Sequence, residues 1–354
     1  MSFDPHAAQQ APQVPQAQQA QHVPQAPQVH FPAPAAQHPA PPAPEPLARV
    51  PWGSVGLFVV LALGLAWIVA LPIWLADLSN PAGMSLGTQL LIQFTPVAMM
   101  FTPAIAMLVV VFLAKTPRTG RARFLGLWPL RPAKRVVWFI VLGALAPAIV
   151  VALALLVATL FGWFTPDFEN LSGFTAALGP AATSPEAVRT ILYVQLAMFP
   201  IAGLLNLLPA FGEEIGWRGW LLPALRPLGT WRALVLSGVI WGVWHAPLTL
   251  MGHNFQLFDW RGVVLMTVGS VVWGVLFGWL RLRSGSVWPA VLAHGALNGA
   301  GALFALFAMA GVEQPLWLVN PLGVSGWIAG AIIILVLFVT KQFGKEPALA
   351  PPRR

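Results

Sequence analysis

The chain has 354 residues, of which 57% are hydrophobic and only 8% are charged. A soluble domain carries about a quarter charged residues, so this composition predicts a protein that crosses a membrane several times. The sequence contains no cysteine, which excludes disulfides, thiolate chemistry and cysteine-bound metals. The preference for Arg over Lys and the abundance of Ala, Pro and Gly are typical of GC-rich bacteria. The expected location is therefore the bacterial cytoplasmic (inner) membrane.

Residues 1–48 differ in composition from the rest of the chain. Pro, Gln and Ala dominate, charges are almost absent, and no apolar periodicity appears. Such a segment buries too little apolar surface to offset its ordering entropy, so we predict a disordered cytoplasmic tail. Its Pro-rich repeats can also dock a partner in polyproline II form, although a plain flexible tail is the simpler interpretation. Residues 346–354 are expected to form a short basic C-terminal tail.

Residues 49–345 are interpreted as one all-α transmembrane domain. A membrane-spanning helix needs about 20 apolar residues. The apolar runs predict eight spans, near residues 54–76, 87–113, 136–160, 187–208, 231–250, 262–281, 287–310 and 323–341. The stretch FGEEIGWRGWLLP (211–223) continues the fourth span, past an expected bend at Pro209.

Basic residues lie mainly on one side of the predicted spans. Lys and Arg gather in the connection between spans two and three, in the next two connections on that side, and at the C-terminus. Arg281 and Arg283 are interpreted as loop charges of this side. The positive-inside rule then places both termini in the cytoplasm. The net charge of +8 is explained by topology and by attraction to anionic membrane lipid, so no nucleic-acid partner is expected.

Three ionised groups remain inside the predicted spans, namely Glu213, Glu214 and Arg218. Each costs a few kcal/mol there unless it is paired, so they indicate a functional site, with a structural salt bridge as the alternative. Glu214 and Arg218 are four residues apart and can pair on one helix face. Glu213 is rotated by about 100° and stays free to face a cavity. A carboxylate without a counter-charge in a low-dielectric setting takes up protons more readily, which suits a general base.

The next span carries a polar residue to the depth of the glutamates. Glu213 and His245 are each sixteen residues from Gly229, which lies in the turn between the fourth and fifth spans. In an antiparallel hairpin these two positions come level, roughly 24 Å along the helices from the turn.

His294 and Asn298 bring a third helix to a similar level. They lie ten and fourteen residues beyond Ser284, near the next cytoplasmic turn, and share one helix face because they are four apart. His253 lies at the far end of the fifth span and is interpreted as a loop residue that does not join this group.

Three short motifs therefore occur in order, each on a predicted membrane helix: Glu213-Glu214-x-x-x-Arg218, Trp241-x-x-x-His245 and His294-x-x-x-Asn298. Together they resemble the CPBP family (CAAX-processing and bacteriocin-processing, or Abi) of intramembrane endopeptidases, whose eukaryotic representative is Ras-converting enzyme. The resemblance covers residues 185–310. The family's second motif usually begins with Phe, and Trp241 takes that place here. Because an aromatic residue remains, we expect the shape of the pocket to differ more than its chemistry.

The resemblance implies a role for each motif residue. Glu213 is the general base that activates water, and His245 helps to position that water. His294 and Asn298 stabilise the oxyanion of the tetrahedral intermediate. Glu214 and Arg218 hold the first motif helix in place. The implied activity is hydrolysis of a peptide bond near the cytoplasmic side of the membrane, with a peptide or a membrane protein as substrate.

The sequence does not decide whether the site binds a metal cofactor. Glu213, His245 and His294 are residue types that bind zinc with one position left for water. The zinc-protease signature H-E-x-x-H is absent. Glutamate-type chemistry without a metal is the favoured interpretation.

Two other function classes compete with an endopeptidase. Buried Glu, His and Arg also build the proton relays of transporters, but the sequence lacks an inverted repeat with paired broken helices. A non-catalytic membrane scaffold or immunity protein is the second alternative, and it would not need a complete polar cluster. We therefore expect an endopeptidase.

Overall fold

The computed structural model describes residues 47–76 and 84–343. Within these ranges every named element is a helix, and the β pairing is limited to an isolated bridge between Pro166 and Ala308. The predicted all-α class is confirmed. The predicted tails, 1–48 and 346–354, lie outside the described residues, except for Leu47 and Ala48.

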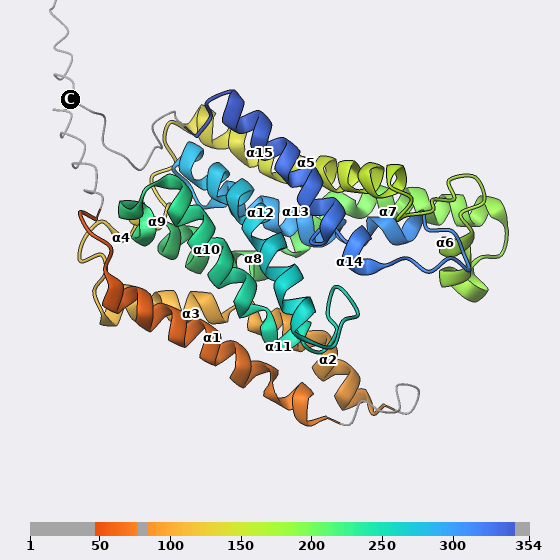
Figure 1. The fold of residues 1–354 in the computed structure, drawn as a ribbon, viewed down its shortest axis with the longest axis horizontal. Coiled ribbons are helices and arrows are strands. Elements are labelled where there is room, and N and C mark those ends of the chain that lie inside the picture. The colour runs from red at the N-terminus through yellow and green to blue at the C-terminus, as the bar shows by residue number, and fades with distance from the viewer. Residues whose placement is uncertain (1–46, 77–83, 344–354) are drawn as a thin grey trace, which may run out of the picture. The chain divides into compact units, whose positions relative to one another are not determined.

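The helices follow one another through the chain without intervening strands in the described part (Figure 1). They are α1 (Trp52–Leu75), α2 (Leu86–Met99), α3 (Thr102–Leu108), the π-helical turn η2 (Val109–Leu113), α4 (Arg121–Phe124), α5 (Ala133–Leu160), α6 (Ser172–Leu178), η3 (Gly179–Ala181), α7 (Pro185–Leu205), α8 (Leu207–Glu214), the π-helical turn η4 (Ile215–Leu221), α9 (Leu222–Leu225), η5 (Arg226–Leu228), α10 (Thr230–Trp244), α11 (Ala246–Thr249), α12 (Trp260–Ser284), α13 (Trp288–Ala300), η6 (Leu303–Leu306), α14 (Leu316–Val319) and α15 (Val324–Val339).

Six stretches of the described chain are long and apolar enough to cross a membrane, so the chain is a multi-pass membrane protein. They are Trp52–Leu75, Leu86–Leu113, Ala133–Leu160, Trp260–Ser284, Trp288–Leu306 and Leu316–Val339. Each overlaps one predicted span. The other two predictions, 187–208 and 231–250, fall on α7 with the start of α8 and on α10 with α11. The number of eight spans is not confirmed, and α10, with 15 residues, is shorter than a spanning helix needs to be.

The bend that precedes FGEEIGWRGWLLP lies at Asn206, three residues before the predicted position at Pro209. α7 ends at Leu205 and α8 begins at Leu207. Pro209 has no N–H to offer the carbonyl of Leu205, and its ring crowds that carbonyl. The helix therefore breaks one turn before the proline.

α10 and α12 lie between α1 to α3 on one side and α5, α13 and α15 on the other (Figure 1). Small residues allow the close contact between α10 and α12. A Cβ atom at Gly238 would lie 2.7 Å from the Cα of Val271, and one at Gly242 would meet the Cα of Thr267. This pair of glycines four residues apart is the pattern that lets membrane helices approach closely. The contact fixes the depth of His245, three residues after Gly242, relative to α12.

Candidate active site

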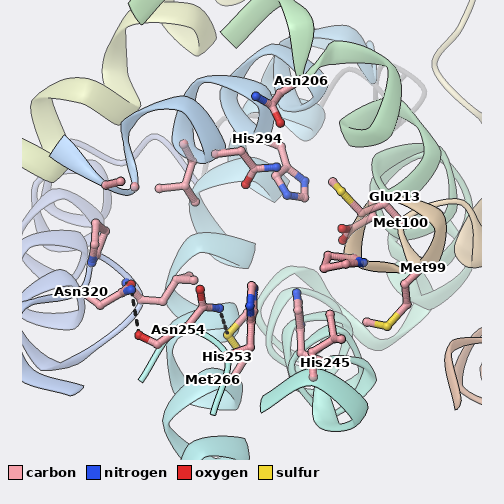
Figure 2. Close-up of a pocket in the computed structure, with 18 of the residues that line it drawn as sticks. Met99, Met100, Asn206, Glu213, His245, His253, Asn254, Met266, His294 and Asn320 are labelled. Carbon is pink, nitrogen blue, oxygen red and sulfur yellow. Dashed lines mark hydrogen bonds between the residues drawn. The ribbon is translucent and has the colours of Figure 1, made fainter. Parts of the chain in front are cut away.

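A cavity of about 650 Å³ opens between the helices that carry the three motifs (Figure 2). All four predicted catalytic residues line it, namely Glu213, His245, His294 and Asn298. They come from α8, the end of α10 and α13, because α8 and α13 pack together and α10 packs against α12. Glu213 and His294 are 2% and 4% exposed, so the cavity reaches the interior of the protein. The predicted convergence of polar groups from three helices is confirmed.

Glu213 accepts two hydrogen bonds from tryptophan side chains. The indole nitrogen of Trp241 donates to Oε2 at 2.7 Å, and that of Trp217 donates to the same oxygen at 3.3 Å. Among the described residues no cation forms an ion pair with Glu213. Its Oε2 is thus occupied, and Oε1 is the oxygen available to the cavity. Since phenylalanine has no such donor, Trp241 changes the chemistry of the site, contrary to the expectation that mainly its shape would differ.

Glu214 is held by two side-chain partners, so its environment differs from that of Glu213. Arg218 Nη1 lies 2.7 Å from Glu214 Oε1, which confirms the predicted pair, and His294 Nδ1 lies 2.9 Å from the same oxygen. The guanidinium of Arg218 also lies 4.2 Å from the centre of the Trp241 ring. The contact between His294 and Glu214 was not predicted. It joins the third motif to the first and fixes the orientation of the imidazole.

His245 is oriented by the main chain of its own motif. Its Nδ1 lies 2.8 Å from the carbonyl oxygen of Trp241. A carbonyl oxygen only accepts, so Nδ1 carries the proton, and in the neutral ring Nε2 is then an acceptor. Figure 2 places the His245 ring at the cavity wall, facing the space in front of Glu213. Trp241 therefore positions two of the predicted residues, through its indole N–H and through its carbonyl.

Arg281 is a further buried charge, and its interpretation as a loop charge was wrong. It lies in the last turn of α12 and is fully buried. Its Nε donates to the carbonyl of Arg218 at 3.0 Å, and its Nη2 donates to the carbonyl of Phe124 at 2.8 Å. Arg281 therefore ties the first motif to α12 and to the end of α4.

The π-helical turn explains why the carbonyl of Arg218 needs a side-chain donor. In η4 the N–H of Leu222 bonds to the carbonyl of Trp217, and the next residue, Pro223, has no N–H. The carbonyl of Arg218 is left without a main-chain donor at these positions, and Arg281 supplies one. Turns of this kind occur frequently at functional sites.

Several other residues line the cavity, although no motif in the sequence pointed to them. His253, expected to stand apart, contributes to the lining, although it does lie in the connection between α11 and α12. Asn206, Asn254 and Asn320 also line it (Figure 2). Asn206 could have been found, because it precedes Glu213 by seven residues and so shares its helix face. The other two lie in connections, where no periodicity indicates their direction.

The residues of the cavity do not fit a zinc site as they are arranged. Nowhere in residues 47–76 and 84–343 do three or more His, Asp or Glu side chains come close enough to hold a metal. The hydrogen bonds to Oε2 of Glu213 and to Nδ1 of His294 leave Oε1 and Nε2 open, so the misfit lies in the separation of the side chains.

Comparisons with known proteins agree with the three motifs. Residues 195–300 match the family model described as type II CAAX prenyl endopeptidase, Rce1-like. CAAX prenyl protease 2 of Methanococcus maripaludis is 26% identical over 161 residues, which cover 44% of this chain and 52% of the relative. The chain thus spans about half the length of that curated relative. The matched residues 195–300 contain all three motifs and the helices that place them around one cavity, so this part of the chain is similar to the CAAX protease (CPBP) family.

Proposed function

We propose that this protein is an intramembrane endopeptidase in which Glu213 is the general base. The observation that carries the proposal is the convergence of Glu213, His245 and His294 on one cavity inside a bundle of apolar helices. The similarity of residues 195–300 to type II CAAX endopeptidases supports the reaction class. The hydrogen bonds of the three side chains support their separate roles.

In the proposed step, Oε1 of Glu213 takes a proton from a water molecule, and the water oxygen bonds to the carbonyl carbon of the peptide group. The carbonyl electrons move to its oxygen and form a tetrahedral oxyanion. When the carbonyl forms again, the C–N bond breaks, and the proton held by Glu213 passes to the leaving nitrogen. The products are a carboxylic acid and an amine.

The histidines suit two different parts of this reaction. His245 presents Nε2 as an acceptor, which can hold one hydrogen of the water while Glu213 takes the other. His294 and Asn298 are proposed to donate to the oxyanion. For His294 to donate through Nε2 while Nδ1 donates to Glu214, its ring must carry both protons, and the carboxylate of Glu214 is the counter-charge.

Cleavage near the cytoplasmic side is a separate proposal, which rests on the distribution of Lys and Arg. The cavity extends to residues 252–256 between α11 and α12, and the same charge rule places that connection on the opposite side. Two routes of entry therefore compete. A membrane-impermeant peptide added to oriented vesicles distinguishes them. Cleavage only when the cytoplasmic face is outside supports the proposal, and cleavage only from the other face contradicts it.

We propose that hydrolysis needs no metal, because the side chains of Glu213, His245 and His294 do not come close enough together to hold one. The expected result is that the purified protein keeps its activity after dialysis against 1,10-phenanthroline and EDTA. Loss of activity that returns with added zinc would contradict this proposal and leave the peptidase reaction itself standing.

Mapping of new protein termini tests the proposed function directly. Native membranes from cells with the wild-type protein are compared with membranes from cells with Glu213→Gln, at equal membrane levels of the two proteins. We expect termini that appear only with the wild type. The absence of any such termini, together with Glu213-dependent proton flux in vesicles, would favour the transporter, and the absence of both would favour a scaffold.

A further inference from the structure

We infer that Arg135 and Arg283 form a binding site for the phosphate headgroup of an anionic phospholipid, whose acyl chains lie along the exposed apolar side of α5. Neither arginine lines the cavity, so this site is separate from the proposed peptidase reaction. The net charge of +8 explains a general attraction of the protein to anionic lipid. The arrangement of these two side chains indicates, in addition, one defined position for one lipid.

The two arginines lie next to each other at one end of two neighbouring helices. Arg135 is in the first turn of α5, and Arg283 is in the last turn of α12. Four residues further into each helix, Phe139 and Trp279 pack edge to face with their ring centres 5.4 Å apart. Because residues four apart share a helix face, this contact brings the two guanidinium groups together. They are close enough for their positive charges to repel each other.

No carboxylate in residues 47–76 and 84–343 pairs with either of these guanidinium groups. The acidic residues of these ranges lie in the first motif, after the far end of α5, at the start of α7, before α12 and before α14, namely Glu213, Glu214, Asp167, Glu169, Glu186, Asp259 and Glu313. Two like charges that are partly withdrawn from water and lack a counter-ion destabilise the protein. An anion that bridges them offsets this cost.

The outer nitrogens of both arginines are available to such an anion. In each side chain Nε is buried and has no hydrogen-bond partner in the described part of the chain, whereas the residue as a whole is half-buried. The Nη atoms make no hydrogen bond there and are not buried, so they face outward. A guanidinium group presents paired N–H donors that match two oxygens of a phosphate. The positive end of the α5 dipole, beside Arg135, also favours an anion.

The surroundings of the pair indicate a lipid as the source of the phosphate. Trp138, three residues after Arg135, is 64% exposed. Tryptophan is enriched at the level of the lipid headgroups. An exposed apolar stripe then follows the same side of α5, namely Val141, Leu145, Ile149 and Leu156. Since α5 is long and apolar enough to cross a membrane, this stripe lies against acyl chains, with the arginine pair at its headgroup end.

Native mass spectrometry of the full-length protein, titrated with phosphatidylglycerol in a neutral detergent, tests the site. Each basic residue contributes about 1 kcal/mol to the binding of anionic lipid, so Arg135→Gln/Arg283→Gln should lower the affinity for the first bound lipid by roughly 30-fold. Arg118→Gln/Arg232→Gln is the matched control, because it removes the same charge from two exposed arginines near other helix ends. We expect the control to change the affinity much less. An equal effect of the two double variants would overturn the inference.

Competition experiments identify the chemical class of the ligand. We expect phosphatidylethanolamine, which carries no net charge, to bind the wild type more weakly than phosphatidylglycerol. We also expect an excess of inorganic phosphate to leave phosphatidylglycerol bound, because phosphate lacks the chains that contact α5. Displacement by inorganic phosphate would assign the site to a soluble phosphate compound and overturn the lipid assignment. Equal binding of the two lipids would overturn the requirement for a net negative headgroup.

Arg283→Glu places a carboxylate of the protein where the phosphate is expected. The negative end of the α12 dipole opposes a glutamate at this position, so any gain in stability must come from pairing with Arg135. We expect a higher melting temperature than for the wild type in lipid-free detergent. Phosphatidylglycerol should raise the melting temperature of the wild type but not of this variant. If the lipid raises both melting temperatures equally, the arginine pair is not the site.

The acidic residues of the two tails are the competing counter-ions for the arginine pair. They are Asp4, Glu45 and Glu346, which lie outside the described residues. We expect Asp4→Asn/Glu45→Gln/Glu346→Gln to bind phosphatidylglycerol with the wild-type affinity. A clear gain in affinity would show that a tail carboxylate occupies the site, and it would overturn the lipid as the resident ligand.

Discussion

The hydrogen bond from Trp241 to Glu213 gives the sharpest prediction about a single atom. The indole N–H donates to Oε2 at 2.7 Å, and both side chains are about 2% exposed. A hydrogen bond to a charged group contributes about 1.5–3 kcal/mol, and each 1.4 kcal/mol is a tenfold change in rate. Trp241→Phe should therefore lower kcat by roughly 10- to 150-fold if the bond holds Glu213 in its reactive position. The second donor, Trp217, is more distant at 3.3 Å and remains, so we expect a result near the lower limit.

The assay is peptide hydrolysis by purified protein, measured together with the thermal stability of each variant. Replacing Trp241 by benzothienylalanine removes the N–H and keeps the shape of the ring, so it separates the hydrogen bond from packing. Trp217→Phe is the control and should lower kcat by only a few-fold. If Trp241→Phe and the benzothienyl variant both hydrolyse the peptide within twofold of the wild-type rate, the bond does not position the base and the reasoning is wrong.

Three further predictions concern stability, each measured as the thermal unfolding of purified protein. Arg218→Met leaves a buried carboxylate without its main counter-charge and should destabilise the protein by about 3–5 kcal/mol; an unchanged melting temperature would contradict this. Arg281→Met removes the donor from two buried carbonyls, and each unsatisfied carbonyl should lower the free energy of unfolding by about 1–3 kcal/mol. A total decrease below about 1 kcal/mol would refute the role assigned to Arg281. Asp167 lies in the connection between α5 and α6, where hydrogen bonds from Ser172 and from the main chain of Asn170 lower its pKa from 3.8 to about 2. Because the pKa is depressed, the contribution of the Asp167 carboxylate to the free energy of unfolding is fully present above pH 3.8. It is lost as the pH falls through about 2. Asp167→Asn should therefore reduce the change in melting temperature across this window, and an unchanged pH dependence would contradict the assignment.

The parts of the site that the sequence predicted depend on spacing along one helix. Glu214 and Arg218 pair because residues four apart share a helix face, and this geometry is nearly the same in any helix. The depth of His245 along its helix could be predicted because it is as many residues from the turn at Gly229 as Glu213 is. The charge, the spacing and the resemblance to known motifs were together enough to bring four residues to one cavity.

The parts that were missed depend on contacts between residues far apart in the chain. The position of Arg281 at a predicted break between spans indicates a loop, yet its side chain donates to a carbonyl sixty-three residues away. That need arises from the π-helical turn at Arg218, which no periodicity in the sequence indicates. Trp241 was treated as a ring of a certain size, and its N–H mattered only because Glu213 on another helix faces it. His253 lines the cavity because the connection after α11 returns toward the site.

The central claim is that Glu213 activates the water that attacks the peptide bond. The most direct measurement is single-turnover hydrolysis of a peptide with a mapped cleavage site, by purified wild-type protein and by Glu213→Gln. Glu186→Gln, which changes a glutamate in the first turn of α7 outside the cavity, is the control. General base catalysis contributes about 10²- to 10⁴-fold, so Glu213→Gln should slow the bond cleavage by at least 100-fold, while Glu186→Gln leaves it unchanged. A Glu213→Gln protein that cleaves the peptide at close to the wild-type rate would contradict the account.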